Sequence, residues 1–189
     1  MNLPNKLTTF RVILIPFFVF FLLAPYFEGY GNYIALVIFI VASLTDFLDG
    51  KIARKYNLVT NFGKFMDPLA DKILVTAALI YFIPLRLAPA WIVILILARE
   101  FLVTSLRLIA SGKGIVIAAD KWGKYKTATT MVWICYALLM TNFIDTMSIG
   151  MQSVCTGIHI ALMILSLALT LLSGFNYLWK NRALIAQAK

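Results

Sequence analysis

Residues 46–71 of this chain read DFLDGKIARKYNLVTNFGKFMDPLAD, a stretch with four aspartates in a sequence that is 62% hydrophobic. These aspartates are half of the eight acidic residues in the chain: Asp46, Asp49, Asp67 and Asp71. A carboxylate near the centre of a bilayer costs roughly 2.5–3.5 kcal/mol on insertion scales. If the surrounding sequence crosses a membrane, four such residues must serve a function that compensates for this cost.

The sequence on both sides of the aspartates is typical of a polytopic membrane protein. Its mean hydropathy is +0.90 and only 13% of its residues are charged. Each helix that crosses ~30 Å of hydrocarbon needs about 20 apolar residues. The sequence predicts an all-α integral membrane fold that forms a single domain over residues 1–189. Six transmembrane helices are expected at about residues 7–27, 33–54, 65–85, 89–110, 127–144 and 152–178.

The basic residues predict the orientation of these helices. If the N-terminus is cytoplasmic, all of the 17 lysines and arginines except Arg86 fall on the cytoplasmic side. Such an excess marks cytoplasmic loops, so both termini are expected in the cytoplasm. The net charge of +9 also suits anionic lipids and phosphorylated substrates. No soluble basic domain is evident, which argues against a nucleic-acid partner.

The aspartates fall into two pairs with helical spacing. Residues three or four positions apart share one helix face, so Asp46 pairs with Asp49 and Asp67 with Asp71. Four carboxylates that converge in a partly dehydrated pocket repel one another unless a cation neutralises them. Hard oxygen ligands without His or Cys favour Mg²⁺ or Mn²⁺, and four carboxylates suffice to bridge two ions. The sequence therefore predicts a two-metal site suited to phosphoryl chemistry.

Small and basic residues accompany the aspartates. Gly50 and Ala53 keep the aspartate face open, Gly63 allows close approach of a ligand, and Arg54 can bind a phosphate oxygen bidentately. The alternative is an ion path in a cation-coupled transporter, since intramembrane acids often mark such paths. The combined spacing of these residues and the absence of an inverted repeat favour the phosphoryl-transfer hypothesis.

The complete pattern D-x-x-D-G-x-x-A-R-(x)8-G-x-x-x-D-x-x-x-D, from Asp46 to Asp71, resembles the signature of the CDP-alcohol phosphotransferase family. The resemblance implies about six transmembrane helices, a homodimer, and an active site on the cytoplasmic side of a bacterial membrane. It also implies that a phosphatidyl or similar group moves from a CDP-linked lipid to an alcohol, with release of CMP.

The resemblance also implies roles for individual residues. Asp46, Asp49 and Asp67 would bind metal, and Asp71 would bind metal and act as general base on the acceptor hydroxyl. The CDP site would be lined by six residues: Asp49, Gly50, Ala53, Arg54, Gly63 and Asp67.

Other motifs concern the acceptor alcohol. Leu7-Thr8-x-x-Arg11, Ala98-Arg99-Glu100 and the segment from Lys121 to Thr127 look like the branch of the family that uses sn-glycerol 3-phosphate. The implied substrates are then CDP-diacylglycerol and glycerol 3-phosphate, and the implied products are phosphatidylglycerophosphate and CMP. Phosphatidylglycerol, serine and an inositol phosphate are the alternative acceptors.

The residues themselves also favour an acidic acceptor. Arg99 and Arg107 lie two turns apart on one expected helix, and Lys124 and Lys126 precede the next, so the four could bind a phosphomonoester. An unpaired arginine at the depth of Arg99 would be costly, which favours a functional role.

Three further expectations concern residues outside these motifs. Glu100 is expected on a different helix face from Arg99, where it could brace another helix. Arg11 either anchors the first helix or reaches the nucleotide, and the first is favoured. His159 is expected to make a polar contact between helices.

Overall fold

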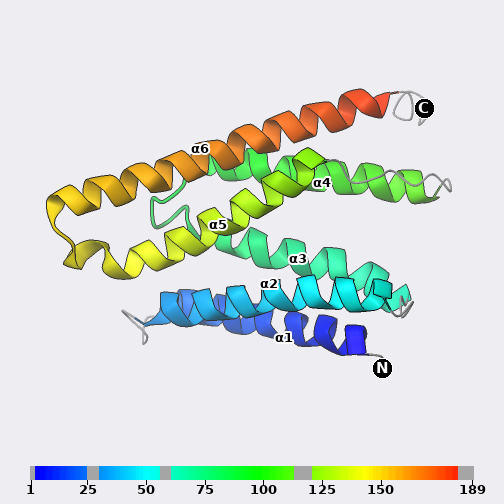
Figure 1. The fold of residues 1–189 in the computed structure, drawn as a ribbon, viewed down its shortest axis with the longest axis horizontal. Coiled ribbons are helices and arrows are strands. Elements are labelled where there is room, and N and C mark those ends of the chain that lie inside the picture. Colours follow the sequence, from blue (N-terminus) through cyan, green and yellow to red (C-terminus); the bar gives the residue numbers. More distant parts are fainter. Residues whose placement is uncertain (1–2, 25–29, 56–60, 113–120, 183–189) are drawn as a thin grey trace. The chain divides into compact units, whose positions relative to one another are not determined.

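The computed structural model describes residues 3–24, 30–55, 61–112 and 121–182. These residues form helices, with described turns at 82–89 and 147–148, and they contain no strand (Figure 1). Each of the six expected helical segments overlaps one α-helix. In chain order the elements are α1 (Leu3–Leu23), α2 (Gly31–Lys55), α3 (Asn61–Tyr81), α4 (Ala90–Gly112), α5 (Lys121–Phe143), η2 (Ile144–Thr146) and α6 (Ile149–Lys180).

Three helical segments among the described residues are long and apolar enough to cross a membrane: Asn5–Leu23, Lys121–Thr146 and Ile149–Lys180. Shorter apolar stretches lie at Gly31–Asp46 of α2 and Lys72–Tyr81 of α3, within the residues whose side chains are described. The aspartates lie in α2 and α3, and α4 carries Arg99, Glu100 and Arg107. The chain is therefore all-α, with the apolar helices of a membrane protein.

The described residues divide into two compact units. The first comprises Met1–Tyr81 and Ile134–Gln152, and the second comprises Phe82–Trp133 and Ser153–Lys189. In the first unit, α1 and α2 run side by side (Figure 1). Their rings meet where Phe18 and Phe39, both fully buried, have centroids 5.9 Å apart. This apolar contact fixes α1 against the helix that carries Asp46 and Asp49.

Polar contacts join the beginning of α2 to the ends of two other helices of the first unit. The Asn32 side-chain amide donates to Thr141 Oγ1 of α5 at 3.0 Å and accepts from the Tyr81 hydroxyl of α3 at 3.3 Å. Because the start of α2 meets the end of α3, these two helices are antiparallel. The end of α2 and the start of α3, where the aspartates lie, therefore fall at the same end of this unit.

In the second unit, a cluster of buried rings holds α5 and α6 to the turn before α4. Trp133 of α5 is fully buried, with its ring 5.7 Å from that of Phe82 and 6.0 Å from that of His159. His159 Nε2 lies 2.7 Å from the Leu87 carbonyl oxygen, which can only accept a hydrogen bond, so Nε2 donates. His159 of α6 thus makes a polar contact, as the sequence predicts, but its partner lies in the turn before α4 and not on another helix.

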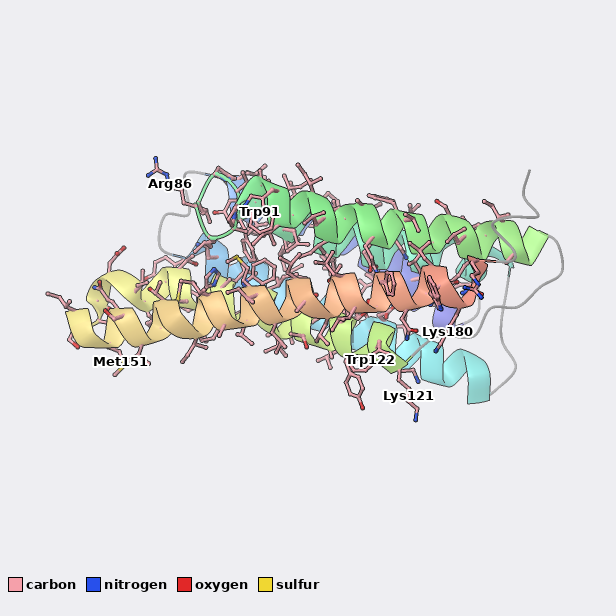
Figure 2. The ribbon with its side chains drawn as sticks, turned by 90° about the horizontal axis from the view of Figure 1, so that it is seen from above. Arg86, Trp91, Lys121, Trp122, Met151 and Lys180 are labelled. Carbon is pink, nitrogen blue, oxygen red and sulfur yellow. The ribbon has the colours of Figure 1, made fainter. Side chains whose placement is uncertain are left out.

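A pair of buried hydroxyls joins α5 and α6 further along. Thr130 Oγ1 donates to the Lys126 carbonyl at 2.9 Å and lies 2.6 Å from Ser166 Oγ. Since the single proton of Thr130 is used on Lys126, Ser166 donates to Thr130. Figure 2 shows the two ends of this unit, with Arg86 and Trp91 at one and Lys121, Trp122 and Lys180 at the other.

Candidate active site

The four aspartates of the motif lie on α2 and α3 of the first unit. Asp46 and Asp49 are three positions apart in the second half of α2, and Asp67 and Asp71 are four positions apart in the first half of α3. Each pair therefore shares a helix face, as its spacing predicts. The side chains of Asp49, Asp67 and Asp71 lie outside the described part of the structure, and so do those of Gly50, Ala53, Arg54 and Gly63.

Asp46 has a described side chain, and it is paired with an arginine from α1. Arg11 Nη1 lies 2.6 Å from Asp46 Oδ1, with the arginine side chain 1% exposed and the aspartate side chain 37% exposed. Arg11 belongs to a buried stripe of α1 with Thr8, Ile15 and Phe18, at the three- and four-residue spacing of one helix face. The arginine is thus fixed by packing, and it orients the carboxylate of Asp46.

This ion pair gives Arg11 a place that sequence reasoning did not assign. The two alternatives for it were an anchor of the first helix and a contact to nucleotide, whereas it contacts the first aspartate of the motif. A sequence signal did exist, because a buried arginine needs an acidic partner and few acids were available. The partner itself, 35 positions away, depends on how α1 packs on α2.

The carboxylate of Asp46 is placed where it could act as a metal ligand. One oxygen contacts Arg11, and the side chain is partly exposed rather than enclosed by protein. Arginine pairing is a common way to orient a ligating carboxylate. Among the side chains that the structure describes, no group of three or more His, Cys, Asp or Glu residues could hold a metal ion. The other three expected ligands are outside that set.

A second group of charged residues lies in the second unit, on α4 and α5. Glu100 Oε1 accepts hydrogen bonds from Arg99 Nη1 and from Lys126 Nζ, both at 2.7 Å. The Lys126 side chain is 3% exposed, that of Arg99 13% and that of Glu100 22%. The structure therefore brings together two of the four residues expected to bind the acceptor phosphate, and one carboxylate joins them.

The position of Glu100 agrees with part of the expectation for this residue and adds a contact to it. It braces another helix, as predicted, because Lys126 belongs to α5. Neighbouring residues point about 100° apart around a helix, so Arg99 and Glu100 start from different faces of α4. Both side chains are long enough to bend toward each other, and they form an ion pair that the sequence did not predict.

Arg99 runs between two glycines of the neighbouring helices. A Cβ atom added to Gly174 of α6 would lie 2.9 Å from Arg99 Cγ, and one added to Gly123 of α5 would lie 3.8 Å from Arg99 Nη2. The Nε atom of Arg99 is buried, and no acceptor among the described residues takes its proton. Arg99 thus has one guanidinium nitrogen engaged by Glu100, and its buried Nε has no partner among the described residues.

The other two expected phosphate-binding residues are more exposed. The Arg107 guanidinium carbon lies 5.4 Å from the centre of the Tyr177 ring, a cation–π distance, and Tyr177 is itself 3% exposed. Lys124 is exposed at the start of α5. Because Lys124 lies two positions from Lys126, the two point to nearly opposite faces of α5, and only Lys126 reaches Glu100.

Comparison with known proteins agrees with the motif. The family model described as CDP-alcohol phosphatidyltransferase matches residues 1–173. A protein of Bacillus subtilis (strain 168) named CDP-diacylglycerol--glycerol-3-phosphate 3-phosphatidyltransferase is 44% identical over 190 residues, 95% of each chain.

Two further relatives carry the same name. One, from Haemophilus influenzae, is 41% identical over 69% of this chain and 72% of its own. The other, from Shigella flexneri serotype 5b, is 38% identical over 96% of both chains. Their names are those of transferases, and the family consists of enzymes that act on CDP-linked alcohols. The chain belongs to the CDP-alcohol phosphatidyltransferase family.

Proposed function

We propose that this enzyme transfers the phosphatidyl group of CDP-diacylglycerol to sn-glycerol 3-phosphate, giving phosphatidylglycerophosphate and CMP. The observation that carries the proposal is the 44% identity, over 95% of both chains, to a relative named for this donor and this acceptor. The motif from Asp46 to Asp71 supports the donor chemistry, and the basic cluster of the second unit supports a phosphorylated acceptor.

The reaction breaks the phosphoanhydride bond of the donor and forms a phosphate ester bond to the acceptor. The C1 hydroxyl oxygen of glycerol 3-phosphate attacks the β-phosphorus of CDP-diacylglycerol in line with the bond to CMP. That bond breaks, CMP leaves with the bridging oxygen, and the hydroxyl proton passes to the carboxylate of Asp71. A carboxylate is a weak base by its ordinary pKa, but the neighbouring aspartates of a crowded acidic site raise the proton affinity of such a group.

The aspartates would also hold the metal. The family generally depends on a divalent metal. Asp46, Asp49, Asp67 and Asp71 would bind two Mg²⁺ or Mn²⁺ ions through hard carboxylate oxygens. The partly exposed carboxylate of Asp46, oriented by Arg11, fits this role. When bound, such ions neutralise the charge of phosphate oxygens on the attacking and leaving sides.

The residues between the aspartates would form the CDP site. Gly50, Ala53 and Gly63 lack bulky side chains, so the nucleotide could approach the helix backbones closely. Arg54 would bind a phosphate oxygen bidentately. Asp49 and Asp67 would contribute to this site as well as to the metal. The acyl chains of the donor would stay in the bilayer and enter between helices.

The acceptor phosphate would be bound by Arg99, Arg107, Lys124 and Lys126. Arg99 and Lys126 are the strongest members of this set, because both are largely buried and Glu100 holds them in fixed positions. A phosphomonoester would accept hydrogen bonds from guanidinium donors of Arg99 that Glu100 does not occupy. Arg107 and Lys124 are more exposed, which suits capture of the anion rather than its final positioning.

The proposed setting is a bacterial cytoplasmic membrane crossed six times, with both termini and the active site facing the cytoplasm. The separation of Arg86 from Lys121 and Lys180 at opposite ends of the second unit supports this orientation (Figure 2). A single membrane domain and a homodimer are part of the same proposal, and they rest on the resemblance to the family. Family membership favours the transferase over the cation-coupled transporter.

The proposal is tested by CMP release from CDP-diacylglycerol by purified protein with Mg²⁺, in the presence of one acceptor at a time. We expect CMP release with glycerol 3-phosphate and little with serine, phosphatidylglycerol or an inositol phosphate. Release with serine alone would contradict the proposed acceptor and leave the family chemistry intact. If none of the acceptors increases CMP release, the enzymatic proposal itself is contradicted.

A further inference from the structure

The side chain of Arg99 is confined by α6 at one particular position. Gly174 of α6 faces the stem of Arg99, and this glycine is buried and has no side chain. A Cβ atom at position 174 would come 2.9 Å from Arg99 Cγ, 3.8 Å from Nε and 4.0 Å from Cβ. The absence of a side chain at position 174 therefore leaves the space that the stem of Arg99 occupies.

Arg99 could not relieve this overlap by a small movement of its tip. The clashing atom is Cγ, only two bonds from the backbone, so relief requires rotation about χ1 or displacement of α4 from α6. Either change moves the guanidinium, which is now hydrogen-bonded to Glu100 at 2.7 Å. Since Glu100 also binds Lys126 at 2.7 Å, the displacement would reach both cations of the cluster.

We propose that Gly174 is a positioning residue for the acceptor: the missing side chain at this position fixes Arg99 in the orientation that binds the acceptor phosphate. This inference rests on the proposed function, in which Arg99 binds that phosphate. Gly174 itself touches no substrate and acts through the contact with Arg99 Cγ.

The variant Gly174→Ala tests the proposal, with Gly157→Ala as its matched control. Both positions lie on α6, and a Cβ atom at Gly157 meets nothing within 4 Å. Alanine is a better helix former than glycine, so neither change weakens the helix itself. We expect Gly174→Ala to raise the KM for glycerol 3-phosphate by about tenfold or more, because small displacements of a positioned group are costly. The KM for CDP-diacylglycerol should stay within twofold of the natural enzyme in both variants.

The double variant Arg99→Ala/Gly174→Ala separates a positioning role from a general effect on packing. Alanine at position 99 has no Cγ, so the added methyl group at 174 meets no clash there. We expect the double variant to match Arg99→Ala alone in KM for glycerol 3-phosphate and in thermal midpoint. If Gly174→Ala fails to fold, the double variant should restore a folded protein.

Three results would overturn the inference. The first is a Gly174→Ala enzyme with the same kinetics as Gly157→Ala. The second is a double variant whose KM for glycerol 3-phosphate is higher than that of Arg99→Ala alone. The third is a Gly174→Ala enzyme whose KM values for glycerol 3-phosphate and CDP-diacylglycerol rise equally. The proposed role of Arg99 fails separately, when Arg99→Ala leaves the KM for glycerol 3-phosphate unchanged. Gly174→Ala without effect beside a defective Arg99→Ala would refute only the role of Gly174.

Discussion

Arg11 Nη1 lies 2.6 Å from Asp46 Oδ1 and joins a buried residue of α1 to the first aspartate of the motif on α2. The arginine cannot swing away, because its helix face is packed among buried residues of the first unit. A carboxylate held in this way has one oxygen fixed and its orientation restricted. The packing of α1 therefore bears directly on the proposed metal site.

Replacement of Arg11 should weaken metal binding. In Arg11→Ala the carboxylate of Asp46 loses the group that orients it, and loss of such an outer partner typically costs about 10–100-fold in metal affinity or activity. We expect the Mg²⁺ concentration that gives half-maximal CMP release to rise by that order. The measurement is a Mg²⁺ titration of the purified variant at saturating substrates.

Lys6→Ala is the control for this variant, since Lys6 is an exposed cation on the same helix. It should titrate with Mg²⁺ like the natural enzyme. An Arg11→Ala enzyme that is folded and has an unchanged Mg²⁺ requirement would show that the ion pair serves the fold alone.

Replacement of Glu100 by glutamine should make the second unit dependent on a bound anion. Glu100→Gln keeps a side-chain oxygen near Arg99 and Lys126 but removes the negative charge that both now share. Two largely buried cations then lose the negative charge that they share, which is destabilising. The thermal midpoint should fall, and glycerol 3-phosphate should raise it more in the variant than in the natural protein. An equal or smaller shift in the variant would argue against phosphate binding beside Glu100.

The buried hydroxyl pair of α5 and α6 should contribute modestly to stability. Thr130→Val leaves Ser166 Oγ without its acceptor, now 2.6 Å away. Hydrogen bonds between membrane helices contribute about 0.6–1.7 kcal/mol, so each of Thr130→Val and Ser166→Ala should lower the free energy of unfolding by that order. The double variant should lose less than the sum, as measured by denaturant titration in mixed micelles. Strict additivity would mean that the two hydroxyls do not interact.

The ring of Tyr177 should assist Arg107 without help from its hydroxyl. The guanidinium carbon lies 5.4 Å from the ring centre, while the buried hydroxyl has no hydrogen-bond partner among the described residues. Tyr177→Leu removes a cation–π contact of about 0.5–1 kcal/mol and should raise the KM for glycerol 3-phosphate roughly two- to fivefold. Tyr177→Phe keeps the ring and should behave like the natural enzyme. If both changes raise the KM for glycerol 3-phosphate to the same extent, the role belongs to the hydroxyl instead.

The helices and the aspartate pairs could be predicted from sequence because they depend on local spacing. Apolar length defined the six segments, and intervals of three and four placed Asp46 with Asp49 and Asp67 with Asp71 on shared faces. The number of membrane crossings stays a prediction, because α4 carries Arg99, Glu100 and Arg107 within an otherwise apolar helix.

The contacts between helices could not be predicted in the same way. The pairing of Arg11 with Asp46 and the approach of Gly174 to Arg99 join residues far apart in the chain, so they depend on how the helices pack. Glycines in membrane helices are common, which left no reason to single out Gly174. The ion pair of Arg99 with Glu100 was missed because helical spacing describes the direction of Cβ and not the reach of a long side chain.

The most direct test of the central claim is the lipid product that the purified enzyme forms from labelled glycerol 3-phosphate. With CDP-diacylglycerol and Mg²⁺, the label should enter a lipid identified by mass spectrometry as phosphatidylglycerophosphate, with one CMP released per lipid formed. Asp71→Asn should form none while remaining folded, because it lacks the proposed base. A natural enzyme that releases CMP while the label stays in the aqueous phase would contradict the proposed transfer to glycerol 3-phosphate.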